Sequence, residues 1–192
     1  IWNLTNKVKH VTDITNASRT MLYNIKDEIW DHELLDLFNI RKSILPTVLS
    51  NKDEYGRIHT EHFGIEIPIG GVVGDQQSAS LGQLCLKKGM IKATYGTGCF
   101  VLINTDKNKI TSKNKLLTTV ASKIDEKKQY AVEGSIFNAG TVIQWLRDEM
   151  KLFNHVNEIE EIIQDSKNDV TFIPAFTGLG APYWKSEVRG SL

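Results

Sequence analysis

Apolar residues recur at helical spacing in three parts of the chain. The first follows Asp31, a residue type that caps helix N-termini well, and predicts a helix that ends near Asn39. The second predicts a helix over residues 137–150, and the third a helix over residues 156–164. An apolar face of this kind is expected where a helix packs on a core.

Runs of β-branched residues predict strands between these helices. The segments KATY and CFVLIN flank Gly96-Thr97-Gly98 and predict a hairpin with a glycine turn. Further strands are predicted over residues 130–133 and 170–176. Hairpins followed by helices indicate an α/β fold with a mixed sheet flanked by helices.

The character of the chain changes near residue 70. Polar, turn-rich sequence gives way to a β-branched run over residues 65–74, which proline and glycine interrupt. A helical stretch is then predicted over residues 75–89. We therefore expect a junction near residue 70 that separates a domain over 1–70 from a domain over 71–192.

Composition excludes several classes of function. The 192 residues hold 23 Lys and Arg against 23 Asp and Glu, so no net charge draws the protein to nucleic acid or to an anionic membrane. A small-molecule ligand is the better expectation. No apolar stretch approaches the roughly 20 residues of a membrane helix, and no signal peptide is evident, so a cytoplasmic protein without a transmembrane segment is expected.

The cysteines and histidines give no metal signal. Cys85 and Cys99 lack the spacing of a disulfide framework or a zinc site, and they suit a reducing compartment. His59 and His62 form the only close histidine pair in the sequence. Because that pair lies in polar, turn-rich sequence, surface histidines are expected there rather than metal ligands.

The segment Gly74-Asp75-Gln76-Gln77 falls where an apolar run meets the start of a predicted helix. Asp is among the best N-cap residues, so a structural cap is the simpler interpretation of these four residues alone. The functional interpretation is that a carboxylate held ionised at a helix N-terminus can accept a proton from an alcohol. Neighbouring amides could then hydrogen-bond further hydroxyls of a polyol.

The glycine turn Gly96-Thr97-Gly98 is the second candidate. A lone Gly-x-Gly in a hairpin is most simply a tight turn, because glycine adopts positive φ without steric cost. In a functional interpretation, the missing side chains let a phosphate approach the backbone N–H groups while the Thr97 hydroxyl adds a donor. The segment lacks the lysine of a Walker loop, which disfavours a P-loop nucleotidase.

Two further segments allow both kinds of interpretation. Residues 138–145 start a helix with Ala139 and Gly140, which fits either a flat ligand at the helix start or ordinary packing with Trp145 in the core. Residues 177–184 fit either a mobile loop over a cleft or a structural turn with aromatic anchors. The residues alone favour packing at the first segment and leave the second open.

Taken together, the ordered set VTDITNASRTML, GDQQSASLGQLC, ATYGTGCFVLIN, GTVIQWLRDEMK and PAFTGLGAPYW resembles the FGGY family of carbohydrate kinases over nearly the whole chain. Glycine turns are common, but this order and spacing of motifs is specific to the family. The resemblance implies two actin-like (ribonuclease H-like) domains, each a mixed sheet flanked by helices. Residues 1–70 would then end the substrate-binding domain, and residues 71–192 would begin the nucleotide-binding domain.

The resemblance implies ATP-dependent phosphorylation of a small polyol, glycerol, by direct in-line transfer. Asp75 would be the general base that accepts the proton of the terminal hydroxyl. Gln76 would hold a neighbouring hydroxyl, and Phe100 would pack against the carbon skeleton.

For the nucleotide, the resemblance implies ATP and Mg²⁺. Thr97, with the backbone of Gly96 and Gly98, would contact the terminal phosphates. The nucleotide side would be lined by Gly140, Ile143 and Gln144. Mg²⁺ would bridge the phosphates, and no residue of this chain is assigned to it as a ligand.

Several parts of the family's cleft have no counterpart in this sequence: the N-terminal phosphate loop with its Asp, an upstream Arg-Glu pair and an adenine-binding glycine segment. The chain also starts at Ile1 and stops at Leu192 without the polar, flexible sequence typical of domain boundaries. We therefore expect an internal piece that is inactive alone. The resemblance further implies a dimer or tetramer for the whole protein. Glu66 stands where some relatives carry the Arg of an inhibitor loop, which disfavours inhibition by fructose 1,6-bisphosphate.

Two other functions compete with this one. Another kinase of the same family would act on a pentulose or on erythritol, but Gln76-Gln77 and Phe100 resemble the members that act on the smaller triol. A noncatalytic actin-like fragment would act through binding or assembly. Retention of Asp75 and Thr97 argues against a decayed site of that kind.

Overall fold

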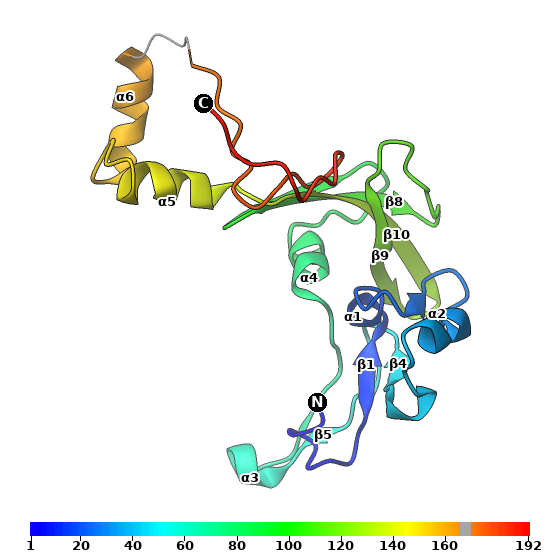
Figure 1. The fold of residues 1–192 in the computed structure, drawn as a ribbon. Coiled ribbons are helices and arrows are strands. Elements are labelled where there is room, and N and C mark those ends of the chain that lie inside the picture. Colours follow the sequence, from blue (N-terminus) through cyan, green and yellow to red (C-terminus); the bar gives the residue numbers. More distant parts are fainter. Residues whose placement is uncertain (166–169) are drawn as a thin grey trace. The chain divides into compact units, whose positions relative to one another are not determined.

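The computed structural model describes residues 1–165 and 170–192, and Figure 1 labels most of their helices and strands. This part of the chain divides into two compact units. The first unit comprises residues 1–92, 102–111 and 117–132, and the second comprises residues 93–101, 112–116 and 133–192. These units reflect packing, and the domain junction expected near residue 70 stays a prediction.

Short elements make up most of the first unit. Its helices are α1 (Ile14–Ala17), α2 (His32–Leu37), α3 (Thr60–Phe63) and α4 (Asp75–Gly82), with a 3-10 turn at Lys42–Ile44. Strand β1 (Val11–Asp13) runs parallel to β4 (Thr47–Leu49). The antiparallel pairs are β2 (Tyr23–Asn24) with β3 (Ile29–Trp30), and β5 (Arg57–Ile58) with β6 (Ile67–Pro68). The β1–β4 register sets Asp13 opposite Leu49 and so brings two distant segments together.

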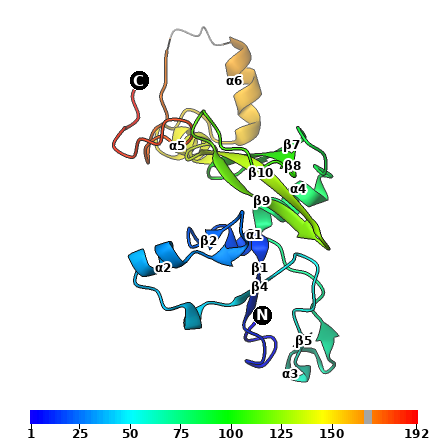
Figure 2. The ribbon, with the colours of Figure 1, turned by 90° about the vertical axis from the view of Figure 1, so that its right-hand side faces the viewer.

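A four-stranded sheet supplies residues to both units. Its strands are β7 (Ile91–Tyr95), β8 (Cys99–Asp106), β9 (Leu117–Ile124) and β10 (Lys127–Ile136), in the order β7-β8-β10-β9 (Figure 2). The neighbours β7 and β8 are joined by residues 96–98 alone, so the predicted glycine hairpin is confirmed. Strand β10 contains the strand predicted over residues 130–133.

Strand β9 is not predicted by the sequence. Its segment LTTVASKI mixes short polar and apolar residues without the strict alternation of a half-buried strand. In the structure its four central residues, 119–122, are all buried. The strand is therefore recognised only through its neighbours in the sheet.

The core of the first unit lies where α1 packs on β9. Ile14 and Ala17 of α1 are buried in one cluster with Tyr23, Val120 and Tyr130. Burying such side chains contributes roughly 25 cal/mol per Å² of apolar surface. A helix of four residues is not stable by itself in water, so α1 owes its conformation to this packing.

Helix α2 has the ends that the sequence predicts. The Asp31 carboxylate accepts hydrogen bonds from the backbone N–H groups of Glu33 and Leu34 at 3.1 and 3.2 Å. Asn39 adopts a left-handed conformation (φ +54°) just after the helix, as a C-terminal stop residue does. Both predicted ends are confirmed.

Helix α4 is shorter than predicted. It ends at Gly82, so the end expected at Gly89 is wrong. Leu84 adopts a left-handed conformation (φ +56°), which helical backbone does not tolerate. Cys85 is buried and lies beyond the end of this helix.

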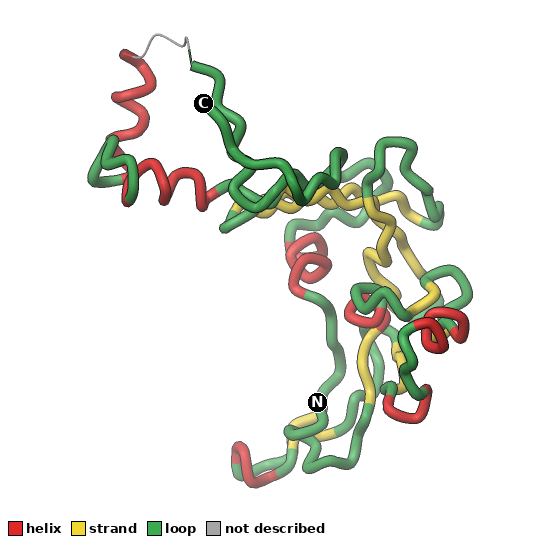
Figure 3. Tube along the Cα trace, viewed as in Figure 1, coloured by secondary structure: helices red, strands yellow, loops and turns green. Residues whose placement is uncertain are grey.

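The second unit holds the remaining helices. They are α5 (Gly140–Asp148), a 3-10 turn at Val156–Glu158 and α6 (Ile159–Asp165), which confirm the two helices predicted there. The strand predicted over residues 170–176 is wrong, because Figure 3 draws this segment as loop and Ile173 makes only an isolated bridge to Ser191. Pro174 has no N–H to donate and so interrupts a ladder. Within the described residues, no helix has the length and apolarity to span a bilayer.

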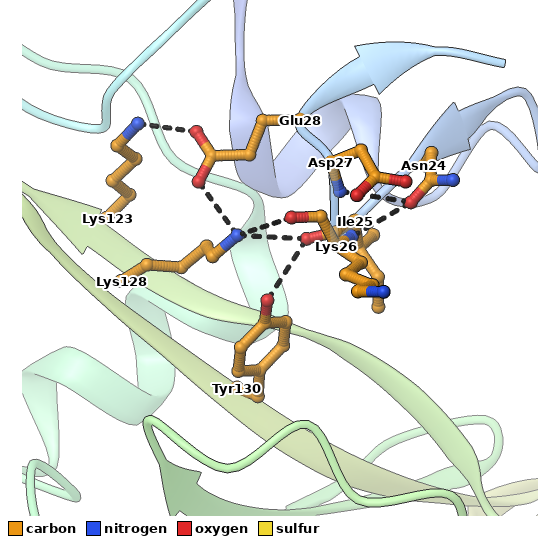
Figure 4. A network of polar contacts seen from close by, with 8 residues as sticks. All are labelled: Asn24, Ile25, Lys26, Asp27, Glu28, Lys123, Lys128 and Tyr130. Carbon is orange, nitrogen blue, oxygen red and sulfur yellow. Dashed lines mark hydrogen bonds and ion pairs between the residues drawn. The ribbon is translucent and has the colours of Figure 1, made fainter.

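Figure 4 shows a polar network around Glu28, between β2 and β3. The Glu28 carboxylate pairs with the ammonium groups of Lys123 in β9 and Lys128 in β10, at 2.5 and 2.7 Å. Lys128 also donates to the carbonyl of Ile25 at 3.1 Å, and the Tyr130 hydroxyl donates to the same carbonyl at 3.2 Å. These contacts fasten the β2–β3 hairpin to the sheet.

The network also changes the titration of its members. Burial alone would raise the pKa of Glu28, but the hydrogen bonds from Lys123 and Lys128 outweigh that effect and hold the pKa below its ordinary value. Burial, followed by the charge of Glu28, raises the pKa of Tyr23 to about 12. The two lysines therefore keep Glu28 ionised in mildly acidic solution.

Replacing Glu28 by Gln is expected to lower the free energy of unfolding at pH 7 by about 1–2 kcal/mol, because two charged hydrogen bonds at partly buried positions are lost. Folding lowers the pKa of Glu28, so its contribution is present above the ordinary pKa of 4.5 and is lost as the pH falls through the folded-state value. Denaturant unfolding from pH 7 to pH 3 should show the two proteins converging in acid.

The matched control is Lys52→Gln, which removes an exposed ion pair with Asp125. This variant should change the free energy of unfolding by less than about 0.5 kcal/mol at any pH. A difference between wild type and Glu28→Gln that stays constant down to pH 3 would contradict the role given to Glu28.

Candidate functional site

Asp75 is the first residue of α4, and its side chain is exposed. Gly74 occupies the N-cap position, so the interpretation of Asp75 as a structural cap is wrong. In the described chain the Asp75 carboxylate accepts one hydrogen bond, through Oδ1 from the backbone N–H of Gln76 at 2.7 Å. Its second oxygen is available to a ligand at the helix N-terminus.

The two glutamines after Asp75 lie in different environments. Gln77 is 2% exposed and donates to the carbonyl of Val120 at 3.2 Å, which anchors α4 to β9. Gln76 is only partly buried, and its side-chain oxygen accepts a hydrogen bond from the ammonium of Lys92 in β7. Gln76 therefore stands beside the exposed carboxylate, whereas Gln77 belongs to the core.

A buried carboxylate fixes the backbone that enters α4. Asp13 is fully buried and accepts hydrogen bonds from the N–H of Thr15 at 2.7 Å and the amide of Asn51 at 2.8 Å. The Thr15 hydroxyl donates to Asp13 and accepts from the N–H of Gly74 at 2.8 Å. Asn51 also donates to the carbonyl of Val72 at 3.0 Å. The network thus holds the entering backbone at two points.

The turn at residues 96–98 is joined to the start of α5 by backbone hydrogen bonds. The N–H of Gly140 donates to the carbonyl of Gly96 at 2.8 Å. The N–H groups of Ala139 and Thr141 donate to the carbonyl of Thr97 at 2.9 and 3.3 Å. Two segments predicted separately are therefore one structural feature, which we call the glycine junction (residues 96–98 and 139–141).

Close approach explains the glycines of this junction. A Cβ on Gly140 would lie 2.5 Å from the carbonyl oxygen of Gly96. A Cβ on Gly98 would lie 2.5 Å from the carbonyl oxygen of Ile136. Neither position has room for a side chain, so glycine is required by packing whatever ligand the junction binds.

An exposed face extends from the junction along α5. Ile143 and Gln144 follow Gly140 by three and four residues, which places all three on one side of the helix. Both side chains are exposed, as is Thr97 in the turn. The second unit thus holds all the residues predicted to contact the nucleotide: Gly96, Thr97, Gly98, Gly140, Ile143 and Gln144.

The aromatic residues near this face have separate roles. Trp145 was expected in the core and is only partly buried, against Phe172 and Phe176 with ring centroids 5.7 and 5.2 Å away. Phe100 follows the turn in β8 and is also partly buried. It belongs to the second unit, whereas the Asp75 group belongs to the first.

The loop at residues 177–184 is anchored to the rest of the second unit. The N–H of Ala181 donates to the carbonyl of Ser135 at 2.9 Å, and the indole of Trp184 donates to the carbonyl of Lys115 at 2.6 Å. Gly180 packs so closely on Ser135 that a Cβ would lie 2.1 Å from its carbonyl oxygen. These contacts support the structural-turn interpretation of the loop.

Sequence reasoning missed the residues that support Asp75 and Gln76. Lys92 carries a signal, since a charged residue inside a β-branched strand is unusual, but burial was needed to interpret it. Asp13, Thr15 and Asn51 give no comparable signal, because these residue types are common in turns and Asn51 lies far from the other two in sequence.

Replacing Thr15 by Val is expected to lower the free energy of unfolding by about 2 kcal/mol, because the Gly74 N–H and the Asp13 carboxylate each lose a buried partner. Amide hydrogen exchange at Gly74 should accelerate in this variant and recover in Thr15→Ser. The control Thr119→Val removes an equally buried hydroxyl, whose one hydrogen-bond partner within residues 1–165 and 170–192 is Ser18, so it should leave Gly74 protected. Unchanged exchange at Gly74 in Thr15→Val would count against the network.

Replacing Gly140 by Ala is expected to cost about 1–3 kcal/mol of stability, since the new methyl group meets backbone and not a flexible side chain. The matched change Gly82→Ala, at the end of α4, meets no atom within 4 Å and should be neutral or stabilising by up to about 1 kcal/mol. Thermal unfolding of the two variants measures the contrast. If Gly140→Ala and Gly82→Ala were equally stable, the glycine junction would have room for a methyl group, against the contacts described above.

Two family models match the chain: the FGGY family of carbohydrate kinases, N-terminal domain, over residues 1–82, and the C-terminal domain of the same family over residues 91–192. The crystal structure of Plasmodium falciparum glycerol kinase with ADP matches 99% of this chain with a TM-score of 0.88 and 42% identity. Xylulose kinase from Lactobacillus acidophilus matches 100% with a TM-score of 0.82 and 27% identity. The match covers 38% and 39% of those chains and confirms the expected α/β, actin-like fold.

Curated relatives agree with the solved structures. The glycerol kinases of Chromobacterium violaceum and Lactobacillus delbrueckii subsp. bulgaricus are each 53% identical to this chain and match all of it. The chain spans 39% of the length of each relative. It belongs to the FGGY family of carbohydrate kinases and carries sequence of both the N-terminal and the C-terminal domain.

Proposed function

We propose that the complete protein to which these residues belong transfers the terminal phosphate of ATP to glycerol and releases sn-glycerol 3-phosphate. The substrate is inferred from relatives named glycerol kinase that are 53% identical across the whole chain. The observation that carries the proposal is the exposed carboxylate of Asp75 beside the amide of Gln76 at the start of α4. These groups suit a polyol, because one accepts a proton and the other hydrogen-bonds a second hydroxyl.

Asp75 acts as the general base in this proposal. Its open oxygen accepts the proton of the terminal hydroxyl while the hydroxyl oxygen bonds to the γ-phosphorus and the bond to the β–γ bridging oxygen breaks. Asp75 is the first residue of the eight-residue helix α4, and its exposed side chain is open to the substrate hydroxyl. Gln76 hydrogen-bonds a neighbouring hydroxyl, and Phe100 packs against the carbon atoms.

The glycine junction is proposed to hold the nucleotide. Gly96 and Gly98 present backbone without side chains, and the exposed Thr97 adds a hydroxyl donor for the terminal phosphates. The exposed face of α5, with Gly140, Ile143 and Gln144, is proposed to line the rest of the nucleotide. That face suits a flat ligand because its first residue has no side chain.

Mg²⁺ is proposed as the accompanying ion, whose charge neutralises the phosphate oxygens during transfer. Across residues 1–165 and 170–192, no three His, Cys, Asp or Glu side chains gather as a metal cage. Mg²⁺ in kinases is usually held by phosphates, water and one or two carboxylates. No ligand for it is assigned in this chain.

A pentulose is the second candidate substrate, because xylulose kinase from Lactobacillus acidophilus is 27% identical over the whole chain. Glycerol is preferred, since the identity to glycerol kinases is about twice as high at 53%. The choice rests on similarity, and a substrate panel decides it.

The location and assembly of the whole protein are further proposals. A cytoplasmic enzyme is proposed, because its proposed substrate ATP is available in the cytoplasm. Cys85 and Cys99 are both buried free thiols, which suits a reducing compartment. A homodimer or homotetramer is proposed from the family resemblance. The 192 residues alone are expected to be inactive, because they span 39% of the relatives' length.

Asp75→Asn in the complete protein is expected to lower kcat for glycerol by about 10²–10⁴-fold while ATP binding is unchanged, since only proton acceptance is removed. Steady-state phosphate transfer to a panel of polyols and ketoses, with ATP affinity measured by calorimetry, tests this. Asp36→Asn, an exposed carboxylate on α2, is the control and should retain full activity. Preferred turnover of a ketose would contradict glycerol as the substrate. An active Asp75→Asn variant would contradict the assignment of Asp75 as the general base.

A further inference from the structure

Lys92 is a buried cation next to the proposed substrate site. It lies in β7 and is 1% exposed, although lysine is among the residues least often buried. Its ammonium donates a hydrogen bond to the side-chain oxygen of Gln76. An ammonium removed from water is costly unless its hydrogens are bonded, so this contact is a defined feature of the interior.

The contact determines which way the Gln76 amide faces. An amide can present either its oxygen, an acceptor, or its NH₂ group, a donor, and the two are nearly isosteric. An ammonium has hydrogens to donate and no lone pair, so only the amide oxygen can face Lys92. The NH₂ group of Gln76 is then left to face any ligand held beside Asp75.

We propose that Lys92 is a positioning residue that fixes the orientation of the Gln76 amide and thereby makes this position a hydrogen-bond donor to the substrate. The inference rests on the proposed function and deepens it. The substrate atom that meets Gln76 must then be an acceptor, such as a hydroxyl oxygen that accepts from the amide while its own hydrogen is bonded elsewhere. Lys92 touches Gln76 and not the reacting atoms, so its effect falls on binding of the polyol.

A purely structural role for Lys92 predicts different behaviour. If Lys92 only stabilised the fold, replacing it would lower the free energy of unfolding. It would then weaken the binding of ATP and of the polyol together, or leave both affinities unchanged. Positioning through Gln76 instead raises KM for the polyol with little change in KM for ATP. It also makes the effect of Lys92 depend on the presence of Gln76, which a double-mutant cycle detects.

The experiment uses the complete protein and four variants: Lys92→Met, Gln76→Leu, the double variant, and Lys88→Met as the control. Lys88 is an exposed lysine four residues before Lys92. Lys92→Met and Gln76→Leu are each expected to raise KM for glycerol about tenfold, because each change costs one good hydrogen bond to the substrate. KM for ATP should stay within about twofold of the wild-type value. The double variant should equal Gln76→Leu, and Lys88→Met should equal wild type.

Gln76→Glu keeps the test decisive if Lys92→Met fails to fold. A carboxylate at position 76 retains the contact with Lys92, so the fold is kept, but it has no N–H to offer the substrate. Its KM for glycerol should rise as in Gln76→Leu, while its melting temperature stays at or above that of wild type.

The outcomes separate the two proposals. Wild-type protein that does not phosphorylate glycerol overturns the proposed function, and this inference with it. Glycerol turnover with an unchanged KM in Gln76→Glu overturns the inference alone, because a donor at that position is then unnecessary. Additive effects of Lys92→Met and Gln76→Leu also overturn it, since Lys92 would then act without Gln76.

Discussion

A carboxylate removed from water must be satisfied by hydrogen bonds, and Asp13 meets that requirement with Thr15 and Asn51. Each partner is bonded in turn to the backbone that enters α4, at Gly74 and at Val72. The exposed end of α4 therefore depends on a contact made in the interior. The first residues of the helix are therefore held in place by hydrogen bonds between buried side chains and the backbone that precedes them.

The second unit positions its candidate residues by a different constraint. At the glycine junction the backbone of the turn and the backbone of α5 approach so closely that no Cβ fits on Gly98 or Gly140. Backbone contact of this kind leaves few alternative conformations, because neither partner can rotate a side chain out of the way. The junction thus presents Thr97 on closely packed backbone, which suits the phosphate-binding role proposed for it.

Different buried or partly buried lysines contact the β2–β3 hairpin and the candidate site. The network of Glu28 with Lys123 and Lys128 joins a hairpin to the sheet. Within the described residues, none of its hydrogen bonds or ion pairs involves α4. Lys92 is also a buried cation, and one of its partners is the side chain of Gln76 at the proposed substrate site. Lysine therefore joins packed segments in one place, and in the role proposed for Lys92 it supports ligand recognition in the other.

The sequence alone determined the α/β class, the glycine hairpin, the helices after Asp31 and residue 140, and the family, because these depend on local periodicity, turn chemistry and motif order. It did not determine β9, whose burial comes from neighbouring strands, or the loop at residues 170–176, where Pro174 outweighs β-branched composition. It also placed Asp75 at a cap that Gly74 occupies. Only the tertiary structure revealed Lys92 behind Gln76, because burial and pairing are properties of segments brought together by folding.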